Sequence, residues 1–429
     1  MGIRAAVKNR VARSLFSIER RNANRVKAER KRLSSGASHI VEYFHEVGDP
    51  YSHLMVQVLP EFCRRYEVEL KVYLVPPPPD WAAPDRERLE TYSRLDSARL
   101  GKRAGLRFTD PGKQPSPDQI RLANAKLMAA IDQGTFLEAA EQFGDQLWQG
   151  TLTEEGASSS DIETALKANG AHRDELGHYL GATLYYAGEW YWGPDRLHYL
   201  EQRLRELSAT TSHSSEALIY PPADAPSGNT GRIPGAAPEL HWYLSLRSPY
   251  TAIVGDRVKA LAEAYGATLK LRYVLPMVMR GMKVPRKKGF YIMSDVVREA
   301  ERQGTPFGNA VDPVGEPVER GCAILEAAIQ RGKGFEFAKS FLTGVWADGL
   351  DAGTDRGLKK ITERVGLSWA EMKPLIGTDG WRPVAEANRE EMFKYEIWGV
   401  PSFRVGEVAV WGQDRLWVIE DALKAMVES

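Results

Sequence analysis

The feature of this sequence that most restricts its fold is an internal repeat in which the second half of the chain follows the first at a fixed spacing. Pro50-Tyr51 recurs as Pro249-Tyr250 and Leu70-Lys71 as Leu269-Lys270, each 199 positions later and without a gap. The same spacing relates further pairs: Tyr66 and Tyr265, Val75 and Val274, Pro77 and Pro276, Tyr92 and Tyr291, Asp96 and Asp295, Gly105 and Gly304, Phe108 and Phe307. Near the ends the spacing is larger, and residues 193–197 match residues 412–416. We interpret this as two copies of one domain, not as a short-period solenoid.

Each copy shows the same order of expected elements: strand, helix, strand, a long helical segment, a short hairpin and a final helix. In the first copy, residues 39–45 and 68–75 read as strands, and the periodicity from 86 to about 166 is helical with breaks at 110–112 and Gly150. Residues 181–192 could form two short strands, and 193–196 open a last helix through 207. A parallel strand–helix–strand unit followed by a hairpin is α/β, and the helical segment is an insertion over one end of the sheet.

The composition divides the chain into four segments. Residues 1–37 form a basic N-terminal arm, 38–207 the first domain, 208–238 a linker rich in Ser, Thr, Pro, Gly and Ala, and 239–429 the second domain. The first 33 residues carry eleven Lys or Arg and two acids, with apolar positions at roughly helical spacing. This amphipathic helix suits a targeting arm, a membrane-surface helix or a contact to an acidic partner, or else a solvated helix that packs its apolar stripe on its own domain.

Overall composition excludes several classes of protein. The 429 residues are 43% hydrophobic with a net charge of zero, so we expect large cores and no global attraction to nucleic acid. We see no transmembrane run and no signal peptide. Two distant cysteines, Cys63 and Cys322, without a Cys-x-x-Cys pair argue against dithiol redox chemistry and cysteine-rich zinc sites, and favour a cytoplasmic protein.

Ser248 lies at a predicted strand-to-helix turn of the second copy. The run from Leu240 to Leu246 reads as a strand, and Pro249 fits the first turn of a helix that continues to Tyr265. A hydroxyl at such a turn lies where free backbone N–H groups and the positive helix end favour an anion, which we interpret as a thiolate of a bound cofactor. The alternative is an ordinary N-cap serine.

Three other segments of the second copy could join Ser248. Pro401 precedes an edge strand, and a cis Val400-Pro401 peptide would turn the Val400 N–H and C=O outward to pair with an extended ligand, the alternative being a plain trans proline. Asp414 could accept a ligand ammonium or only cap a helix, and Arg415 could hold a carboxylate or form a surface ion pair. The cations 286–288 could meet a ligand carboxylate or form a solvated basic turn.

Together these motifs resemble a known family. Ser-Pro-Tyr after the first strand, Arg-Lys-Lys-Gly-Phe-Tyr before a helix, Gly-Val-Pro-Ser-Phe and Trp-Gly-Gln-Asp-Arg-Leu are similar to the 2-hydroxychromene-2-carboxylate isomerases and the related kappa-class glutathione transferases. The resemblance covers residues 239–427 well and 38–206 weakly. It implies two tandem DsbA-type thioredoxin-like domains, each with an inserted all-helical subdomain, and glutathione as cofactor.

The resemblance also implies roles for individual residues. Ser248 would bind the glutathione sulfur, Val400 and Pro401 the cysteinyl backbone, and Lys288 would be the lysine before the Gly-aromatic-Tyr turn. The segment Gln413, Asp414 and Arg415 would hold the γ-glutamyl end. A hydroxyl donor at a helix N-terminus lowers a thiol pKa from about 8.5, which makes the sulfur a nucleophile without a metal. The expected activity is isomerisation of, or glutathione transfer to, a small aromatic or unsaturated acid.

The sequence departs from the family in two places. The stretch 276–285 is short and lacks the family's glutathione-contacting Asn, and Trp398 is bulky and either lines the substrate pocket or packs. The first copy has Asp49 at the position of Ser248, Leu89 at that of Lys288, and Gly181-Ala182 at that of the Val-Pro pair. A carboxylate would repel a thiolate, so we expect no productive glutathione binding there. The tandem would then form an internal pseudo-dimer with one live site, or a homodimer. The alternative function is a non-catalytic tandem thioredoxin-fold binding protein.

Overall fold

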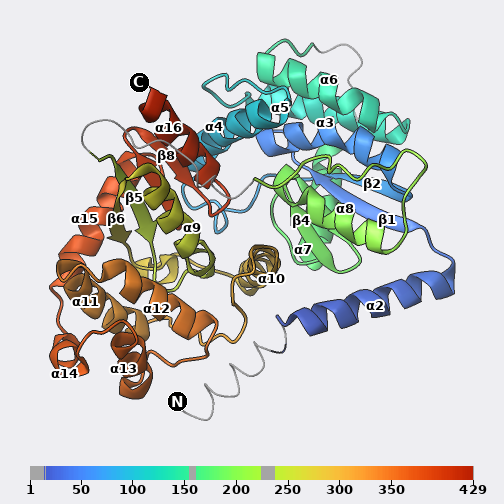
Figure 1. Cartoon of the computed structure of the whole chain (residues 1–429). Helices are drawn as coiled ribbons and strands as arrows, with labels where there is room; N and C mark the ends of the chain where they lie inside the picture. Colours follow the sequence, from blue (N-terminus) through green and yellow to red (C-terminus); the bar gives the residue numbers. More distant parts are fainter. Residues whose placement is uncertain (1–13, 15, 154–160, 224–236, 429) are drawn as a thin grey trace. The chain divides into compact units, whose positions relative to one another are not determined.

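The structure is a computed structural model that describes residues 14, 16–153, 161–223 and 237–428. It divides into two compact units (Figure 1). We call the unit made of Asn22–Pro222 and Pro285–Tyr291 the N-terminal unit, and the unit made of Met1–Arg21, Ala223–Val284 and Ile292–Ser429 the C-terminal unit. Each unit contains one four-stranded sheet, and the fold is mixed α/β.

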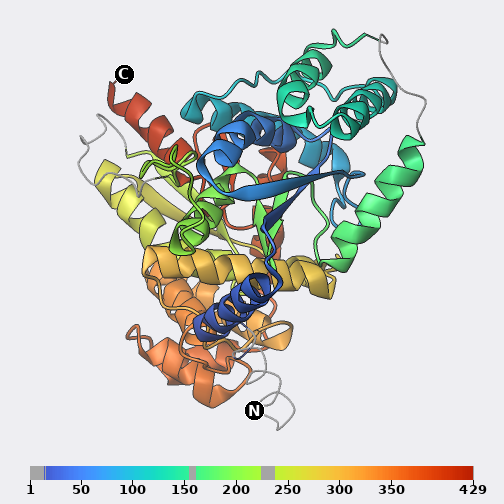
Figure 2. The same ribbon diagram turned by 90° about the vertical axis from the view of Figure 1, so that its right-hand side faces the viewer.

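The sheet of the N-terminal unit has the strand order β2-β1-β3-β4, with β1 and β2 parallel and the other pairs antiparallel. Helices α5 and α6 of this unit pack against each other (Figures 1 and 2). Its elements are α2 (Ile18–Ser35), β1 (His39–His45), α3 (Pro50–Arg65), β2 (Val68–Leu74), α4 (Arg86–Ala104), α5 (Pro117–Asp132), α6 (Phe136–Gln149), α7 (Ile162–Glu175), β3 (Thr183–Tyr186), β4 (Glu189–Trp192), the 3-10 helix η1 (Pro194–Arg196) and α8 (Leu197–Glu206).

The sheet of the C-terminal unit has the order β6-β5-β7-β8 with the same parallel and antiparallel pairings. Helix α10 begins in the segment 285–291, which packs with the N-terminal unit, and ends in the C-terminal unit. The elements are β5 (Glu239–Leu244), α9 (Pro249–Tyr265), β6 (Thr268–Tyr273), η2 (Met277–Arg280), α10 (Arg286–Gln303), α11 (Glu316–Gln330), α12 (Gly334–Trp346), α13 (Asp355–Glu363), α14 (Trp369–Met372), η3 (Lys373–Leu375), α15 (Trp381–Lys394), β7 (Ser402–Val405), β8 (Val408–Trp411) and α16 (Leu416–Glu428).

The strands and most helices of the two units follow each other in the same order. Helices α3 and α9 begin at residues whose numbers differ by 199, Pro50 and Pro249. From α7 and α15 onward the difference is 219, because these helices begin at Ile162 and Trp381, and both pairs of hairpin strands keep that difference. The 20 additional residues of the C-terminal unit fall between α12 and α15, where α13 and α14 lie.

Several side-chain hydrogen bonds recur at corresponding positions. The Tyr51 hydroxyl donates to Asp96 at 2.8 Å, and that of Tyr250 donates to Asp295 at 2.8 Å. The Asn169 side chain donates to the Leu74 carbonyl at 2.9 Å, and that of Asn388 to the Tyr273 carbonyl at 3.0 Å. Each asparagine therefore ties the last helix of the insertion to the end of the edge strand.

We expect Asn388→Leu to lower the free energy of unfolding of the C-terminal unit by about 1–3 kcal/mol, because the Tyr273 carbonyl loses a buried donor. Asn169→Leu should act in the same direction on the N-terminal unit. Urea denaturation measures both, with Asn24→Ala on the exposed side of α2 as the control that changes stability by no more than about 0.5 kcal/mol. A change for Asn388→Leu as small as that of the control would contradict this role.

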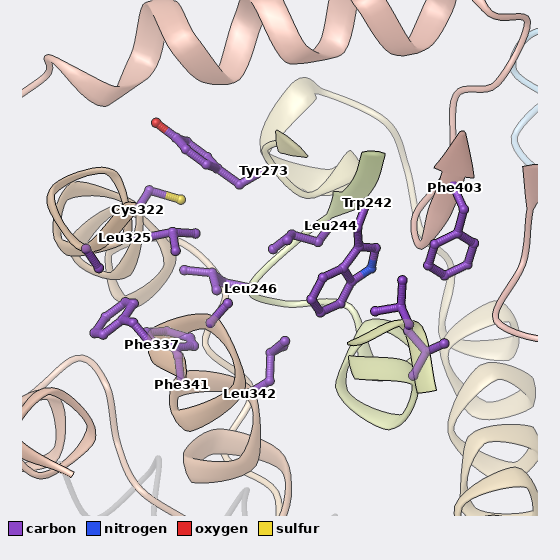
Figure 3. Packing of buried hydrophobic residues seen from close by; sticks show 14 of the residues in the cluster. Trp242, Leu244, Leu246, Tyr273, Cys322, Leu325, Phe337, Phe341, Leu342 and Phe403 are labelled. Carbon is purple, nitrogen blue, oxygen red and sulfur yellow. The ribbon is translucent and has the colours of Figure 1, made fainter. Parts of the chain in front are cut away.

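The core of the C-terminal unit lies between its sheet and helices α9, α11 and α12 (Figure 3). Trp242 of β5, Phe403 of β7 and Phe341 of α12 are fully buried in it. Helix α11 comes close to its neighbours at Gly321, where a Cβ would lie 2.5 Å from the Phe341 ring and 2.7 Å from Leu246. This packing fixes the end of β5, from which the turn to Ser248 leaves.

The structure refines several expectations from the sequence. The helical stretch of the N-terminal unit has a further break at 133–135, between α5 and α6. The expected linker 208–238 is ordered up to Pro222, because Arg65 and Arg205 donate to the carbonyls of Ala217 and Glu216, and its remainder lies largely outside the described residues. No described helix is long and apolar enough to cross a membrane.

The basic arm is helical over its described part, but α2 has no buried residue. Arg25 anchors it through a bidentate ion pair with Glu189 at 2.6 and 2.9 Å. The apolar residues Val26 and Leu33 are 50% and 63% exposed. The apolar positions for which the sequence suggested a stripe precede α2 and, apart from Phe16, lie outside the described residues, so the alternatives for the arm stay predictions.

Candidate functional site

Ser248 is half-buried at the N-terminus of α9, just after β5. Its hydroxyl oxygen accepts a hydrogen bond from the Thr251 N–H at 3.2 Å. Ser248 is therefore an N-cap serine, which was the alternative interpretation of the sequence. The same hydroxyl donates to the Val400 carbonyl at 3.4 Å, which an ordinary cap does not need. Ser248 therefore joins two segments that are 152 residues apart in sequence.

Val400 and Pro401 lie directly before β7, and the peptide between them is cis. Because Ser402 pairs with Tyr243 of β5, this peptide lies beside the end of β5. Val400 is partly exposed, and among the described residues none accepts a hydrogen bond from its N–H. The sequence left the cis and trans forms of this peptide open, and the structure has the cis form.

The turn 412–415 completes the constellation after β8. The Gly412 N–H donates to the Pro401 carbonyl at 3.0 Å. Gly412 has φ +120°, and a Cβ there would lie 2.7 Å from an Asp414 carboxylate oxygen, so glycine is required for this turn. The side chain of Asp414 is 22% exposed, whereas that of Arg415 is 7% exposed and lies 3.3 Å from the Asp414 carboxylate.

Gln413 is placed differently from what the sequence suggested. Its side chain is buried, with both amide atoms bonded inside the protein: the oxygen accepts from Arg257 and from Gln303, the latter at 3.0 Å, and the nitrogen donates to Glu299 at 2.8 Å. Gln413 therefore holds the turn 412–415 from within, and its side chain points into the interior of the unit.

The role of Lys288 as a cofactor contact stays a prediction. This residue lies in the first turn of α10, in the segment 285–291 that packs with the N-terminal unit. Burial lowers the pKa of its ammonium. The neighbouring Lys287 pairs with Asp174 of the same unit.

Burial disfavours the nucleophilic thiolate form of both cysteines. Both thiols are free, burial raises the pKa of Cys63 to about 11, and burial raises that of Cys322 further. Trp398 is 7% exposed and packs against Trp411 with ring centroids 5.1 Å apart, so it packs within the unit and does not line an open pocket.

The corresponding place in the N-terminal unit is filled by the chain itself. Asp49 caps α3 in the position of Ser248, and the Ser52 hydroxyl donates to its carboxylate at 3.0 Å. The same hydroxyl accepts from the N–H groups of Glu46 and Ala182 at 3.2 and 3.0 Å. The Glu46 side chain packs on Gly181 so closely that no Cβ fits there. Glu46 thus covers the residue that corresponds to Val400.

Two neighbouring carboxyl groups at this place have raised pKa values. Burial raises the pKa of Asp49 to about 6, against the hydrogen bonds from Ser52 and Tyr51 that oppose the shift. Burial, followed by the charge of Asp49, raises the pKa of Glu46 well above its usual range. At neutral pH this place thus disfavours a further negative charge such as a thiolate.

The raised pKa of Asp49 predicts how the stability of the N-terminal unit depends on pH. Between pH 3.8 and about 6 the folded state holds the Asp49 proton more tightly than the unfolded chain, so the free energy of unfolding falls as pH rises through that window. Asp49→Asn keeps a good cap and removes this decline. The difference in the free energy of unfolding between this variant and wild type should be about 1–3 kcal/mol larger at neutral pH than near pH 4. Urea denaturation at the two pH values measures it. An equal effect at both pH values would contradict the shift.

The N-terminal unit also has a surface hollow of about 550 Å³, lined by residues that include Arg32, His39 and Glu69. His39 and Val68 stand at the start of the paired strands β1 and β2. The hollow is therefore at the opposite end of these strands from Asp49, and it does not correspond to the place of Ser248.

A comparison with protein families finds a match in the second half of the chain. The family of DsbA-like thioredoxin domains matches residues 239–424, and this part of the chain has the DsbA-like thioredoxin fold. The 2-hydroxychromene-2-carboxylate isomerase of Pseudomonas sp. (strain C18) is 21% identical over 193 residues, which are 43% of this chain and 89% of that protein. The protein of the same name from Pseudomonas putida is 19% identical over 192 residues, 43% of this chain and 93% of that protein.

Solved structures show likeness over a similar share of the chain. A 2-hydroxychromene-2-carboxylate isomerase structure is 18% identical, with a TM-score of 0.38 over 44% of this chain and 95% of the other. The cytosolic disulfide reductase DsbM from Pseudomonas aeruginosa, determined with GSH, is 20% identical, with a TM-score of 0.34 over 44% of this chain and 97% of the other. Each comparison spans the length of one domain.

The sequence did not point to Arg257, Glu299 and Gln303, the partners of Gln413. They come from α9 and α10, and none belongs to a motif. A signal did exist in the repeat: the residues 199 positions earlier are Val58, Leu100 and Ala104, so three polar residues of the second copy replace apolar ones of the first.

Proposed function

We propose that the C-terminal unit binds glutathione and catalyses a glutathione-dependent isomerisation of a small aromatic or unsaturated acid, or a kappa-type glutathione transfer to such an acid. The observation that carries the proposal is the Ser248 hydroxyl at the start of α9, 3.4 Å from the carbonyl oxygen of the partly exposed Val400. A hydroxyl, a helix N-terminus and the partly exposed Val400 backbone would form a cradle for a cysteinyl group whose sulfur is ionised.

The residues present fit glutathione. The Ser248 hydroxyl would donate a hydrogen bond to the sulfur instead of to the Val400 carbonyl, and α9 would add the positive end of its dipole. Together these would lower the thiol pKa. The Val400 N–H and C=O would pair with the cysteinyl backbone. Asp414 would accept the ammonium of the γ-glutamyl end, with Arg415 holding the Asp414 carboxylate in place.

Bound glutathione supplies a sulfur nucleophile that adds reversibly to an unsaturated acid, so that a double bond can become rotatable. The chain's own part is to keep that sulfur ionised and to hold the tripeptide still. Lys288 remains a candidate for a glutathione carboxylate through the family resemblance alone. The two free cysteines and the proposed use of reduced glutathione support a cytoplasmic location.

We further propose that the two units arose by duplication and that only the C-terminal one binds glutathione. The shared strand order and the recurring Tyr–Asp and Asn–carbonyl bonds support the duplication. The closure of the corresponding place by Asp49, Ser52 and Glu46 supports a single live site. The tandem would then act as an internal pseudo-dimer.

Calorimetry with reduced glutathione, followed by an assay with 2-hydroxychromene-2-carboxylate, tests the proposed function. We expect saturable binding of one glutathione per chain and glutathione-dependent isomerisation of this acid or of a related one. Absence of binding would overturn the proposal. Binding without turnover across a panel of unsaturated and aromatic acids would instead support the alternative, a non-catalytic thioredoxin-fold binding protein.

A further inference from the structure

Gln413 is the centre of a part-buried polar network in the C-terminal unit, in which the side chains of Gln413 and Glu299 are buried. Its amide oxygen accepts from Arg257 of α9 and from Gln303 of α10 at 3.0 Å, and its amide nitrogen donates to Glu299 at 2.8 Å. Glu299 also accepts from Gln303 at 3.2 Å and from Arg302 at 3.1 Å. An arginine only donates and a carboxylate only accepts, so these partners fix which end of the Gln413 amide points where.

The N-terminal unit has no such network at the corresponding positions. Arg257, Glu299 and Gln413 correspond to Val58, Leu100 and Pro194, all three of them buried and apolar. Gln303 corresponds to Ala104. The fold can therefore be built with an apolar filling at this place.

The Tyr–Asp hydrogen bond behaves in the opposite way, since it is present in both units at 2.8 Å. This bond belongs to the shared scaffold, whereas among the described residues the network occurs only in the unit that has Ser248 and the Val400-Pro401 pair. Burying ionised and amide groups costs free energy that an apolar filling avoids. Because the fold does not require this network, its role must lie in the segment that it holds in place. That segment is the turn 412–415.

We propose that Arg257, Glu299 and Gln303 are positioning residues for the glutathione site. Through Gln413 they fix the turn that begins at Gly412, so that the Asp414 carboxylate is presented to the ligand ammonium at a constant place. The inference deepens the proposed function and rests on it. None of the three touches the ligand; each acts through Gln413.

The direct test replaces the network by the residues of the N-terminal unit, in the triple variant Arg257→Val, Glu299→Leu and Gln413→Pro of the full chain. We expect the dissociation constant of reduced glutathione to rise about tenfold or more, while the midpoint of urea denaturation stays equal or rises. The turnover number at saturating glutathione should change by less than about threefold, because the interaction with the ligand is the same in ground and transition states.

Two further variants separate positioning from stability. Glu299→Gln keeps an acceptor for the Gln413 amide, so its dissociation constant for glutathione should lie within about threefold of wild type. A larger rise would mean that the negative charge of Glu299 is itself required. Tyr51→Phe breaks the scaffold bond in the N-terminal unit and should lower stability with no change in affinity. If the triple variant fails to fold, Arg257→Met alone, which removes one donor to Gln413, should still weaken binding measurably.

The outcomes are distinguishable from failure of the proposed function. If wild type binds no glutathione, the proposed function fails and the positioning role with it. If wild type binds and the triple variant, or Arg257→Met in its place, binds equally well, the network has only a structural role and this inference alone is overturned.

Discussion

Changing Ser248 to aspartate should reduce the glutathione-dependent kcat/KM about a thousandfold while leaving the stability of the protein nearly unchanged. Aspartate caps a helix as well as serine does, so α9 keeps its N-terminal hydrogen bond. The hydroxyl donor to the sulfur is lost, at about 1.5–3 kcal/mol, and a carboxylate within about 4 Å of a thiolate adds repulsion of similar size. The substitution also reproduces Asp49, the residue found at this place in the N-terminal unit.

Two other substitutions bracket this result. Ser248→Thr keeps both the cap and the hydroxyl and should retain activity within about tenfold of wild type. Ser248→Ala loses the donor without adding charge and should lose about 10- to 150-fold, with the pKa of the bound thiol raised by about one to two units in an ultraviolet titration. If the aspartate variant turned over as fast as wild type, Ser248 would be a helix cap and nothing more.

Asp414→Asn should raise the KM for glutathione by about 10- to 100-fold with little change in kcat. The carboxylate at the Gly412 turn is the acceptor proposed for the γ-glutamyl ammonium, and a hydrogen bond between charged groups contributes about 1.5–3 kcal/mol. Because this end of the tripeptide is remote from the sulfur, the lost interaction is the same in the ground and transition states. Steady-state kinetics with varied glutathione and calorimetry of binding both measure the effect.

The N-terminal unit offers a matched control for Asp414. Asp195 occupies the corresponding position in η1, and Asp195→Asn should leave KM and kcat unchanged. An Asp414→Asn variant with unchanged KM, or one in which only kcat falls, would contradict the assignment of Asp414 to the ligand ammonium.

The local elements of this fold were accessible from the sequence because their signals are local. Alternating and apolar patterns predicted β1 at its observed bounds, 39–45, and the proline after Ser248 predicted the start of α9. The repeat spacing predicted that Asp49 and Ser248 hold corresponding places, and both are N-caps in the structure.

The parts that the sequence did not reveal depend on distant contacts. Gln413 looked like a ligand residue because its neighbours form a motif, yet its partners Arg257 and Glu299 are 156 and 114 residues away and hold its side chain inside the unit. The stretch 208–222 has a linker composition but is held by Arg65 and Arg205 through backbone carbonyls. Composition does not report such contacts, since any residue supplies a carbonyl.

The most direct measurement is a crystal structure of the full chain with reduced glutathione. The account predicts the sulfur at about 3 Å from the Ser248 oxygen, the cysteinyl backbone paired with Val400 and the γ-glutamyl ammonium at Asp414. A tripeptide bound elsewhere, or one whose sulfur points away from the Ser248 hydroxyl, would contradict it.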